Sequence, residues 1–272
     1  MNRIQIKNLS IKIILLLLAM QSTSFLIAQK TDSVKSGVYA WNHLQQKKEK
    51  TSITRQIFKG STLDLAYFEM HATTLQPGKA PHSAHTHGDT EELIIVKQGR
   101  VNVTINGNST TLGPSSVAVI MPGNLHRIEN TGNETGTYYI VKMKSRSATN
   151  RERAAKAGGS FIVNWDTVTV KKTDKGQHRD IFDRPTSQFA RFNVHATTLN
   201  AGQVSHLPHT HRSEEMIVMI KGNVQMNIGN KFYKSSAGDV IFLESEIPHA
   251  LNNTGNSACE YFAFQWQNQF KR

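Results

Sequence analysis

HATTLQPGKAPHSAHTHGDTEELIIVKQG, residues 71–99, is repeated with few changes as HATTLNAGQVSHLPHTHRSEEMIVMIKG, residues 195–222. Each stretch contains a His-Thr-His triplet, then a Glu that ends an acidic pair, and then a Gly seven residues further on. In each half another His follows that Glu by 34 residues. Three imidazoles and one carboxylate form a ligand set typical of transition-metal sites. The repeat therefore predicts two metal centres in one chain.

The candidate ligands form two equivalent sets of three histidines and one glutamate. They are His85, His87, Glu92 and His126 in the first half, and His209, His211, Glu215 and His249 in the second. On a strand, residues i and i+2 face the same side, so we expect each His-x-His pair to point into one interior. Four protein ligands leave two positions of an octahedron open, which is typical of a catalytic or ligand-exchanging ion. One divalent transition metal per half is expected, and Mn, Fe, Ni, Cu and Zn all suit the ligands.

The duplication covers nearly the whole chain. Arg55–Phe58 matches Arg179–Phe182 at an offset of 124 residues, and the predicted units span residues 37–143 and 161–266. An offset above 100 residues indicates two domains, because solenoid repeats have periods of about 20–50 residues. Residues 144–160 are predicted to be a linker, with a possible short helix at 150–157 that ends at Gly158-Gly159.

Within each unit the pattern is that of short strands. Residues 100–106 alternate between apolar and polar, as a half-buried strand does. Asn106-Gly107 and Gly229-Asn230 predict hairpin turns. Apolar runs at 92–97, 116–121 and 138–142 predict further strands, with counterparts in the second unit. The predicted fold class is all-β, with a sandwich or barrel in each unit.

In the first half Gly78 precedes His85 by seven residues, four residues separate His87 from Glu92, and Gly99 and Pro122-Gly-Asn-Leu-His126 follow. The second half has Gly202, His209, His211, Glu215 after three residues, Gly222 and Pro248-His249. This spacing resembles the two motifs of the cupin superfamily. The chain is therefore similar to a bicupin. This resemblance implies two tandem double-stranded β-helix (jelly-roll) barrels, each with an internal metal site. Pro114 after Gly113, and Ser245-Glu246, depart from the usual motif and affect the loop before the last histidine.

Several other side chains near the motifs are candidates for pocket roles. His82 and His206 precede the first ligand by three residues, and either line the pocket and handle protons or cap a loop. His71 and His195 are expected to be packing or interface histidines. Arg191 shares a strand face with His195 and is a candidate for holding an anionic substrate. Glu91 and Glu214 are expected to point away from the metal, into solvent or beside the ligands.

Residues 1–28 resemble a secretory signal peptide: Arg3, Lys7 and Lys12 precede an eight-residue apolar run at 13–20, and Ala28 suits cleavage. An uncleaved membrane anchor is the alternative, although the run is short for a spanning helix. We therefore expect an exported protein, periplasmic or extracellular, with no stable membrane anchor after cleavage. Without the leader the chain has 29 Lys and Arg and 20 Asp and Glu, a net charge of 29 − 20 = +9. The basic residues are spread over the chain, and nucleic acid is not an expected partner of an exported protein. The single Cys259 is expected to be a small buried residue.

The expected function is that of a metal-dependent enzyme of dioxygenase type, acting on a small and possibly anionic chelating substrate. This expectation follows from the resemblance to quercetin dioxygenase-like bicupins, which have the same set of three histidines and one glutamate. The first alternative is an oxalate decarboxylase- or oxalate oxidase-like Mn enzyme. Another is a bicupin that binds sugars or small molecules without turnover. The paired His-x-His sites argue against ureidoglycine aminohydrolase, whose ligand set differs. The state of assembly is open between a monomer and a homo-oligomer.

Overall fold

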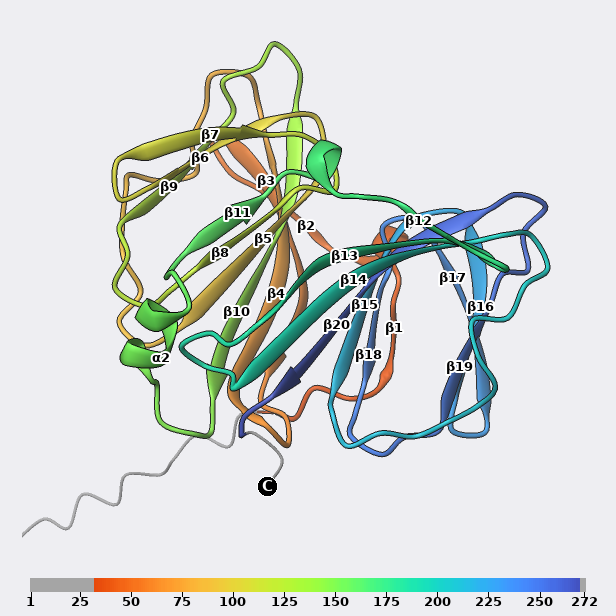
Figure 1. The fold of residues 1–272 in the computed structure, drawn as a ribbon. Helices are drawn as coiled ribbons and strands as arrows, with labels where there is room; N and C mark the ends of the chain where they lie inside the picture. Colours follow the sequence, from red (N-terminus) through yellow and green to blue (C-terminus); the bar gives the residue numbers. More distant parts are fainter. Residues whose placement is uncertain (1–31, 270–272) are drawn as a thin grey trace, which may run out of the picture. The chain divides into compact units, whose positions relative to one another are not determined.

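The computed structural model describes residues 32–269, and nearly all of its regular structure consists of antiparallel strands (Figure 1). This confirms the predicted all-β class. The predicted signal peptide, residues 1–28, lies outside the described residues. Within residues 32–269 no helix has the length and hydrophobicity needed to cross a membrane.

Each barrel consists of one seven-stranded and one three-stranded sheet. In the first barrel the large sheet has the order β11-β8-β5-β10-β4-β3-β2, and the small sheet has the order β7-β6-β9. The strands of this barrel are β2 (Gln46–Lys48), β3 (Ser52–Gly60), β4 (Leu65–Leu75), β5 (Glu91–Gln98), β6 (Val101–Ile105), β7 (Asn108–Leu112), β8 (Val117–Ile120), β9 (His126–Glu129), β10 (Gly136–Ser145) and β11 (Phe161–Val163).

The second barrel repeats this arrangement, with a large sheet β1-β18-β15-β20-β14-β13-β12 and a small sheet β17-β16-β19 (Figure 1). Its strands are β1 (Gly37–Tyr39), β12 (Lys171–Thr173), β13 (Gly176–Arg184), β14 (Arg191–Leu199), β15 (Glu215–Lys221), β16 (Asn223–Ile228), β17 (Lys231–Ser236), β18 (Val240–Leu243), β19 (His249–Asn252) and β20 (Cys259–Gln267). Two 3-10 turns complete the described chain, η1 (Trp41–His43) and η2 (Trp165–Thr167), together with the helix α2 (Arg151–Lys156).

The local sequence explains where these strands begin and end. The alternating segment at 100–106 forms β6, and Asn106 and Gly107 then adopt positive φ angles of 49° and 87° in the hairpin turn to β7. Two consecutive positive φ values are the signature of a type I′ turn, which suits the twist of paired strands. Helix α2 lies within the predicted segment 150–157. The side chain of Asn150 caps its N-terminus by accepting from the backbone N–H of Arg153.

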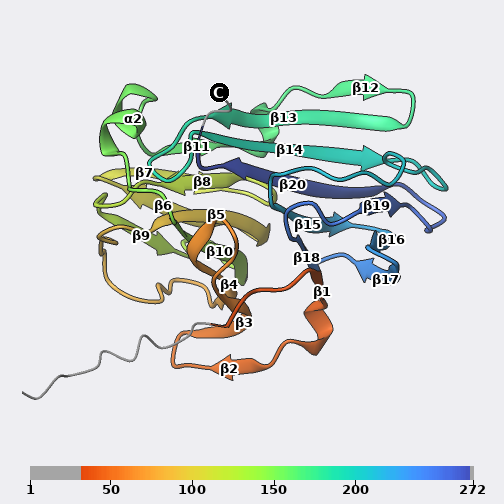
Figure 2. The same ribbon diagram turned by 90° about the horizontal axis from the view of Figure 1, so that it is seen from below.

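The first strand of each half belongs to the other barrel. Strand β1 pairs with β18, and β11 pairs with β8 (Figure 2). The predicted units 37–143 and 161–266 therefore do not coincide with the edges of the two sheets. A strand of three residues has too little sequence pattern to show which sheet edge it will join.

Three apolar cores follow from this topology. Strands buried on both faces place alternate residues in different cores: Ile94 packs inside the first barrel, whereas Leu93 and Ile95 join a core built by both halves. The shared core contains most of the large aromatic side chains, including Phe68, Phe242 and Trp266. Cys259 is buried in the core inside the second barrel, as predicted. The same alternation turns Glu92 and Glu215 each into its own barrel and the preceding Glu toward the shared core.

Candidate metal centres

Backbone pairing brings the first and last histidines of each set together. His85 and His126 form an isolated antiparallel bridge, in which the N–H of His85 donates to the carbonyl of His126 at 3.0 Å and the reverse bond is 2.9 Å. His209 and His249 are paired in the same way, at 3.2 and 3.0 Å. Each last histidine is the first residue of its strand, β9 or β19.

The expectation that each His-x-His triplet lies on a regular strand is wrong. His85 and His209 are held by single-residue bridges, and His87 and His211 lie in loops. The carbonyl oxygens of these loop histidines accept from Gly123 N at 2.7 Å and Glu246 N at 2.9 Å. Pro81 and Pro208, close before the triplets, lack the N–H that a continuous ladder needs. The imidazoles converge because each loop is tied to the loop before the last histidine.

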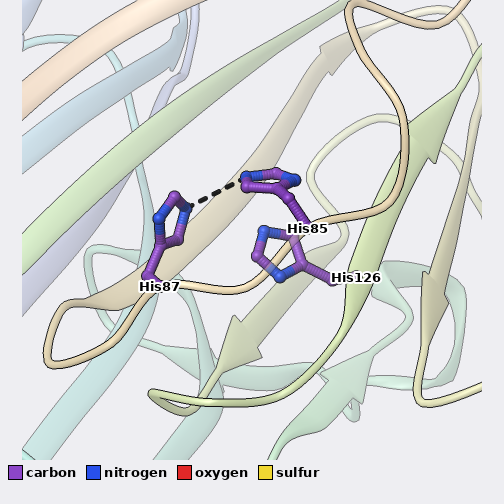
Figure 3. Close-up of side chains that lie close together, drawn as sticks. All are labelled: His85, His87 and His126. Atoms are coloured by element: carbon purple, nitrogen blue, oxygen red, sulfur yellow. Dashed lines mark hydrogen bonds between the residues drawn. The ribbon is translucent and has the colours of Figure 1, made fainter.

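In the first centre His85, His87 and His126 point toward one another (Figure 3). Their ligand atoms lie within 4.8 Å of one another, and the Nε2 atoms of His85 and His87 are 3.2 Å apart. Glu92 completes the set from β5: its carboxylate lies 3.0 Å from Nε2 of His87 and 3.4 Å from Nε2 of His126. The four predicted ligands of the first half therefore share one small volume.

The second centre has the same construction. His209, His211 and His249 again place their ligand atoms within 4.8 Å of one another. Glu215 lies 3.0 Å from Nε2 of His211 and 3.6 Å from Nε2 of His249. His209 is exposed in this centre, whereas His249 is buried. An ion held here would therefore be accessible to a small molecule.

Hydrogen bonds to the backbone leave the correct imidazole nitrogens available. The Nδ1 atoms of His126, His211 and His249 lie 3.1, 2.7 and 2.8 Å from backbone carbonyl oxygens. A carbonyl only accepts, so Nδ1 carries a proton in each ring, and in the neutral ring Nε2 presents its lone pair. Among the described residues, Nε2 of His126 and of His249 are buried without a hydrogen-bond partner. A buried unpaired nitrogen aimed at two other imidazoles and a carboxylate is what a cation would satisfy.

The protonation states of Glu92, Glu215 and His85 also suit a cation. Burial alone would raise the pKa of Glu92, but the neighbouring His126 and His87 outweigh it and hold this pKa well below its usual range. Glu215 is held low in the same way by His211 and His249. Burial and the nearby His126 lower the pKa of His85 to about 4. At neutral pH each centre therefore offers ionised carboxylate, and His85 is in its neutral, ligating form. The residues fit a divalent transition metal in both barrels.

A cavity of about 520 Å³ reaches the second centre, and its wall includes His209, Glu215 and His249. The side chains of His178, His195 and His206 line the same cavity, together with the apolar Ile217, Met226 and Leu251. In the first barrel a cavity of about 440 Å³ lies over Thr54, Gln56, Glu69 and His71.

The predicted pocket histidines lie next to the centres. The ring of His82 packs edge-on against His85 at 4.2 Å between centroids, and His206 packs against His209 at 4.0 Å. Both rings also contact a neighbouring backbone carbonyl, Ser83 O at 3.0 Å and Leu207 O at 3.1 Å. His206 also lies in the cavity wall of the second barrel, and a role of either histidine in proton transfer stays a prediction.

The other candidates differ in position. Arg191 is not brought to the metal centre: its guanidinium lies at the surface and makes a bidentate ion pair with Asp183, at 2.8 and 2.5 Å. His195 lines the cavity of the second barrel and lies 3.2 Å from the side-chain oxygen of Asn193. His71 lies 3.1 Å from the carboxylate of Glu69.

Glu91 and Glu214 point away from the candidate ligands, and of the two surroundings expected for them, solvent or the neighbourhood of the ligands, solvent is excluded. Both are fully buried. Glu91 accepts from Ser187 Oγ at 2.8 Å and from the backbone N–H of Gln188 at 3.3 Å. Glu214 accepts from Thr62 Oγ1 at 2.6 Å and from Leu63 N at 3.0 Å. Each glutamate therefore bonds to a loop of the opposite barrel, which the sequence of one half cannot reveal.

Two residues that sequence reasoning missed lie beside the candidate ligand carboxylates, Glu92 and Glu215. Lys142 Nζ is 4.0 Å from Glu92, and Gln265 donates to Glu215 at 3.0 Å. Each residue follows the last histidine of its set by 16 residues. Each also interrupts an apolar run, residues 138–143 in β10 and residues 261–266 in β20, and this interruption is the signal that could have found it.

Comparison with known proteins places these centres in context. The cupin domain family matches residues 71–142 and 196–264. A curated relative, (S)-ureidoglycine aminohydrolase of Arabidopsis thaliana, is 23% identical over 186 residues, which cover 65% of this chain and 57% of the relative. The match thus spans little more than half of that relative's length.

Solved structures share the two-barrel architecture. A putative glyoxylate-induced protein from Pseudomonas aeruginosa has a TM-score of 0.68 at 15% identity, over 90% of this chain and 94% of that one. Protein Ylba of E. coli has a TM-score of 0.66 at 16% identity, over 91% and 98%. An oxalate decarboxylase of Bacillus subtilis has a TM-score of 0.65 at 15% identity, over 89% and 80%. At these identities the likeness shows the fold.

Proposed function

The chain belongs to the cupin family, as a bicupin, and on this basis we propose that it is an exported metal-dependent enzyme acting on a small chelating substrate. One observation carries the proposal: three candidate ligands of the second centre, His209, Glu215 and His249, form part of the wall of a cavity of about 520 Å³. Cavities that bind small molecules typically measure about 300–1,000 Å³. A purely structural ion does not require such a space beside its ligands.

The side chains around the cavity define what the protein itself contributes. The imidazoles and Glu215 hold the ion, and Gln265 fixes the orientation of Glu215 by donating to its carboxylate. Ile217, Met226 and Leu251 give the cavity an apolar side that excludes water. A divalent transition-metal ion, when bound, would supply Lewis acidity and an anchor for a chelating substrate.

We assign the reaction to the oxygenase class, in which the chelated substrate reacts with O2. The set of three histidines and one glutamate, present in both barrels, supports this assignment through its resemblance to quercetin dioxygenase-like bicupins.

A reaction of a small carboxylic acid without net oxygen uptake is the second candidate. The ammonium of Lys142 beside Glu92 favours an anionic substrate in the first barrel. Related proteins carry names of this kind, an oxalate decarboxylase and an (S)-ureidoglycine aminohydrolase.

The experiment that tests the proposal uses the full chain expressed without a histidine tag. Metal content is measured by elemental analysis, and the protein is then reconstituted separately with Mn, Fe, Ni, Cu and Zn. Each form is incubated with flavonols, oxalate and ureido acids while an electrode follows oxygen and mass spectrometry follows products. We expect oxygen uptake with at least one substrate, and a loss of at least ~100-fold in the His209→Ala, His211→Ala double variant. The matched control, Arg191→Ala, alters a surface ion pair and should retain turnover.

Each result distinguishes the candidates. Product formation without oxygen uptake would select the second candidate. Fewer than about 0.2 ions per barrel, with no effect of chelators on the protein, would exclude a metal-dependent enzyme. Full metal loading without turnover of any substrate would leave a bicupin that binds small molecules without reaction. Export is tested by locating the mature chain after expression with its own leader.

A further inference from the structure

A row of side chains crosses the large sheet of each barrel, starting at the metal-binding glutamate. In the first barrel the strand register places in this row Glu92, Lys142, Glu69 and Lys59. In the second barrel the equivalent row consists of Glu215, Gln265, Asn193 and Asp183. Directly paired residues of antiparallel strands point to the same face of the sheet. Both rows therefore lie on the face that carries the metal centre.

The first row alternates in charge. Lys142 Nζ lies 4.0 Å from the carboxylate of Glu92, and Lys59 Nζ lies 3.7 Å from that of Glu69. Glu69 is also bonded to the hydroxyl of Tyr67 and lies 3.1 Å from His71 Nδ1. The charge of Glu69 is thus shared among three other groups.

Lys142 is less well satisfied than its neighbours. Its side chain is 26% exposed, and across residues 32–269 Glu92 is the carboxylate that lies within 4.0 Å of its ammonium. That separation is longer than a hydrogen bond. An ammonium carries three N–H donors, so Lys142 retains donors for an acceptor that enters beside Glu92.

The second row has no charge at the two middle positions. Gln265 donates to Glu215 at 3.0 Å, and its amide nitrogen lies 3.4 Å from Nε2 of His211. The side-chain oxygen of Asn193 lies 3.2 Å from Nδ1 of His195. At the position paired with the candidate ligand glutamate, the first barrel has the cationic Lys142 and the second has the neutral Gln265. With the same ion in both centres, this one position makes the immediate surroundings of Glu92 one unit charge more positive than those of Glu215.

We propose that Lys142 makes the first barrel the binding site for a small carboxylate ligand, and that Gln265 adapts the second barrel to an uncharged one. This inference rests on the proposed function, because it assigns substrate classes to the same two centres. A bound carboxylate gains a charge-assisted hydrogen bond from Lys142. An uncharged ligand gains nothing comparable, and the desolvation of the ammonium disfavours it. The chain thus carries two centres with equal ligand sets and unequal selectivity.

The test isolates each centre in the full chain. The His209→Ala, His211→Ala variant keeps the first centre, and the His85→Ala, His87→Ala variant keeps the second. Both proteins are loaded with Mn(II), and elemental analysis verifies the loading. Oxalate and, as an uncharged probe, imidazole are then titrated by calorimetry, and the Mn(II) electron paramagnetic resonance signal reports binding beside the ion.

We expect oxalate to bind the first centre about tenfold or more tightly than the second, since one charge-assisted contact commonly changes affinity by that factor. Lys142→Gln, which copies the second barrel, should weaken oxalate binding about tenfold and leave imidazole binding unchanged. The conservative Lys142→Arg should stay within about threefold of the parent. Gln265→Lys in the second-centre protein should strengthen oxalate binding about tenfold.

The outcomes separate this inference from the proposed function. Unchanged oxalate affinity in Lys142→Gln at full Mn(II) loading overturns the inference alone, as does an equal loss for imidazole. If oxalate binding depends on Lys142 but no substrate is turned over, the inference stands and the enzyme proposal fails. If neither centre retains Mn(II), both fail. Thermal melting of each variant, compared with its parent, excludes a loss of fold as the cause.

Discussion

His126 and His249 are each held at three points: a two-way backbone bridge, a hydrogen bond from Nδ1, and a carboxylate beside Nε2. The buried amides four residues later extend this support. Asn130 donates to Leu75 O and Glu134 O and accepts from Gly132 N, and Asn253 makes the same three bonds. The repeated Asn is therefore a structural residue that fixes the loop after each histidine strand.

Replacement of His126 by Ala removes one ligand and leaves the rest of the first centre in place. We expect the metal content of the reconstituted chain to fall from about two ions to about one, since three remaining ligands bind far more weakly. Elemental analysis after dialysis measures this. His82→Ala is the matched control, because His82 touches the ring of His85 without belonging to the ligand group, and it should keep about two ions. Unchanged content in His126→Ala would contradict the assignment.

The two clusters of candidate ligands could be found from the sequence because their spacing is local and appears twice. Lys142 could not be recognised in the same way. It is one of two lysines on β10, beside Lys144, and its proximity to Glu92 arises from the pairing of β10 with β5. Arg191 illustrates the opposite error: strand alternation placed it on the correct face, but Asp183 on the neighbouring strand holds it at the surface.

Among the elements, the turns that leave β5 and β15 explain the repeated glycine of the motif. Gly99 and Gly222 have φ angles of +71° and +82°. A Cβ at Gly99 would lie 2.4 Å from the carbonyl oxygen of Thr135, and one at Gly222 would lie 2.7 Å from Cα of Cys259. These positions need glycine both for backbone conformation and for close approach of the neighbouring strand.

Gly99→Ala and Gly107→Ala form a matched pair that separates these two causes. Gly107 also has a positive φ, +87°, but a Cβ there meets nothing within 4 Å. We expect Gly107→Ala to lower the free energy of unfolding by about 1 kcal/mol, from backbone strain alone. Gly99→Ala adds a clash with the backbone of Thr135, and we expect it to lower the free energy of unfolding by about 2–4 kcal/mol. Chemical denaturation measures both free energies. Equal losses would show that the backbone near Thr135 moves to admit the new Cβ at no cost in stability.

At the scale of the whole molecule, the two barrels hold each other through reciprocal contacts. Glu91 bonds to the loop containing Ser187, and Glu214 bonds to the loop containing Thr62 and to Nε1 of Trp266. Burial raises the pKa of Glu91 to about 7, even though Ser187 and Gln188 donate to it. Each of these glutamates directly precedes a metal-binding glutamate, so the contacts between barrels and the metal centres share a strand.

Glu91→Ala is expected to lower the free energy of unfolding by about 2–4 kcal/mol, because Ser187 and Gln188 N–H lose their buried acceptor and a cavity forms. Glu91→Gln keeps the shape and one acceptor oxygen, and should recover most of this loss. The exposed Glu152→Ala on α2 is the control, with a change within about 0.5 kcal/mol. Thermal and chemical denaturation give these values, and an unaltered midpoint for Glu91→Ala would exclude a role of this contact in stability.

The amino-acid sequence alone determined the all-β class, the duplication and the ligand set. These follow from patterns with periods of a few residues, repeated once at an offset of about 124. Tertiary structure decided the exchange of β1 and β11, the burial of Glu91 and Glu214 between the barrels, and the difference between Lys142 and Gln265 beside the two centres. The physical reason is that these features depend on pairing between strands distant in sequence, and no local periodicity records which strands will meet.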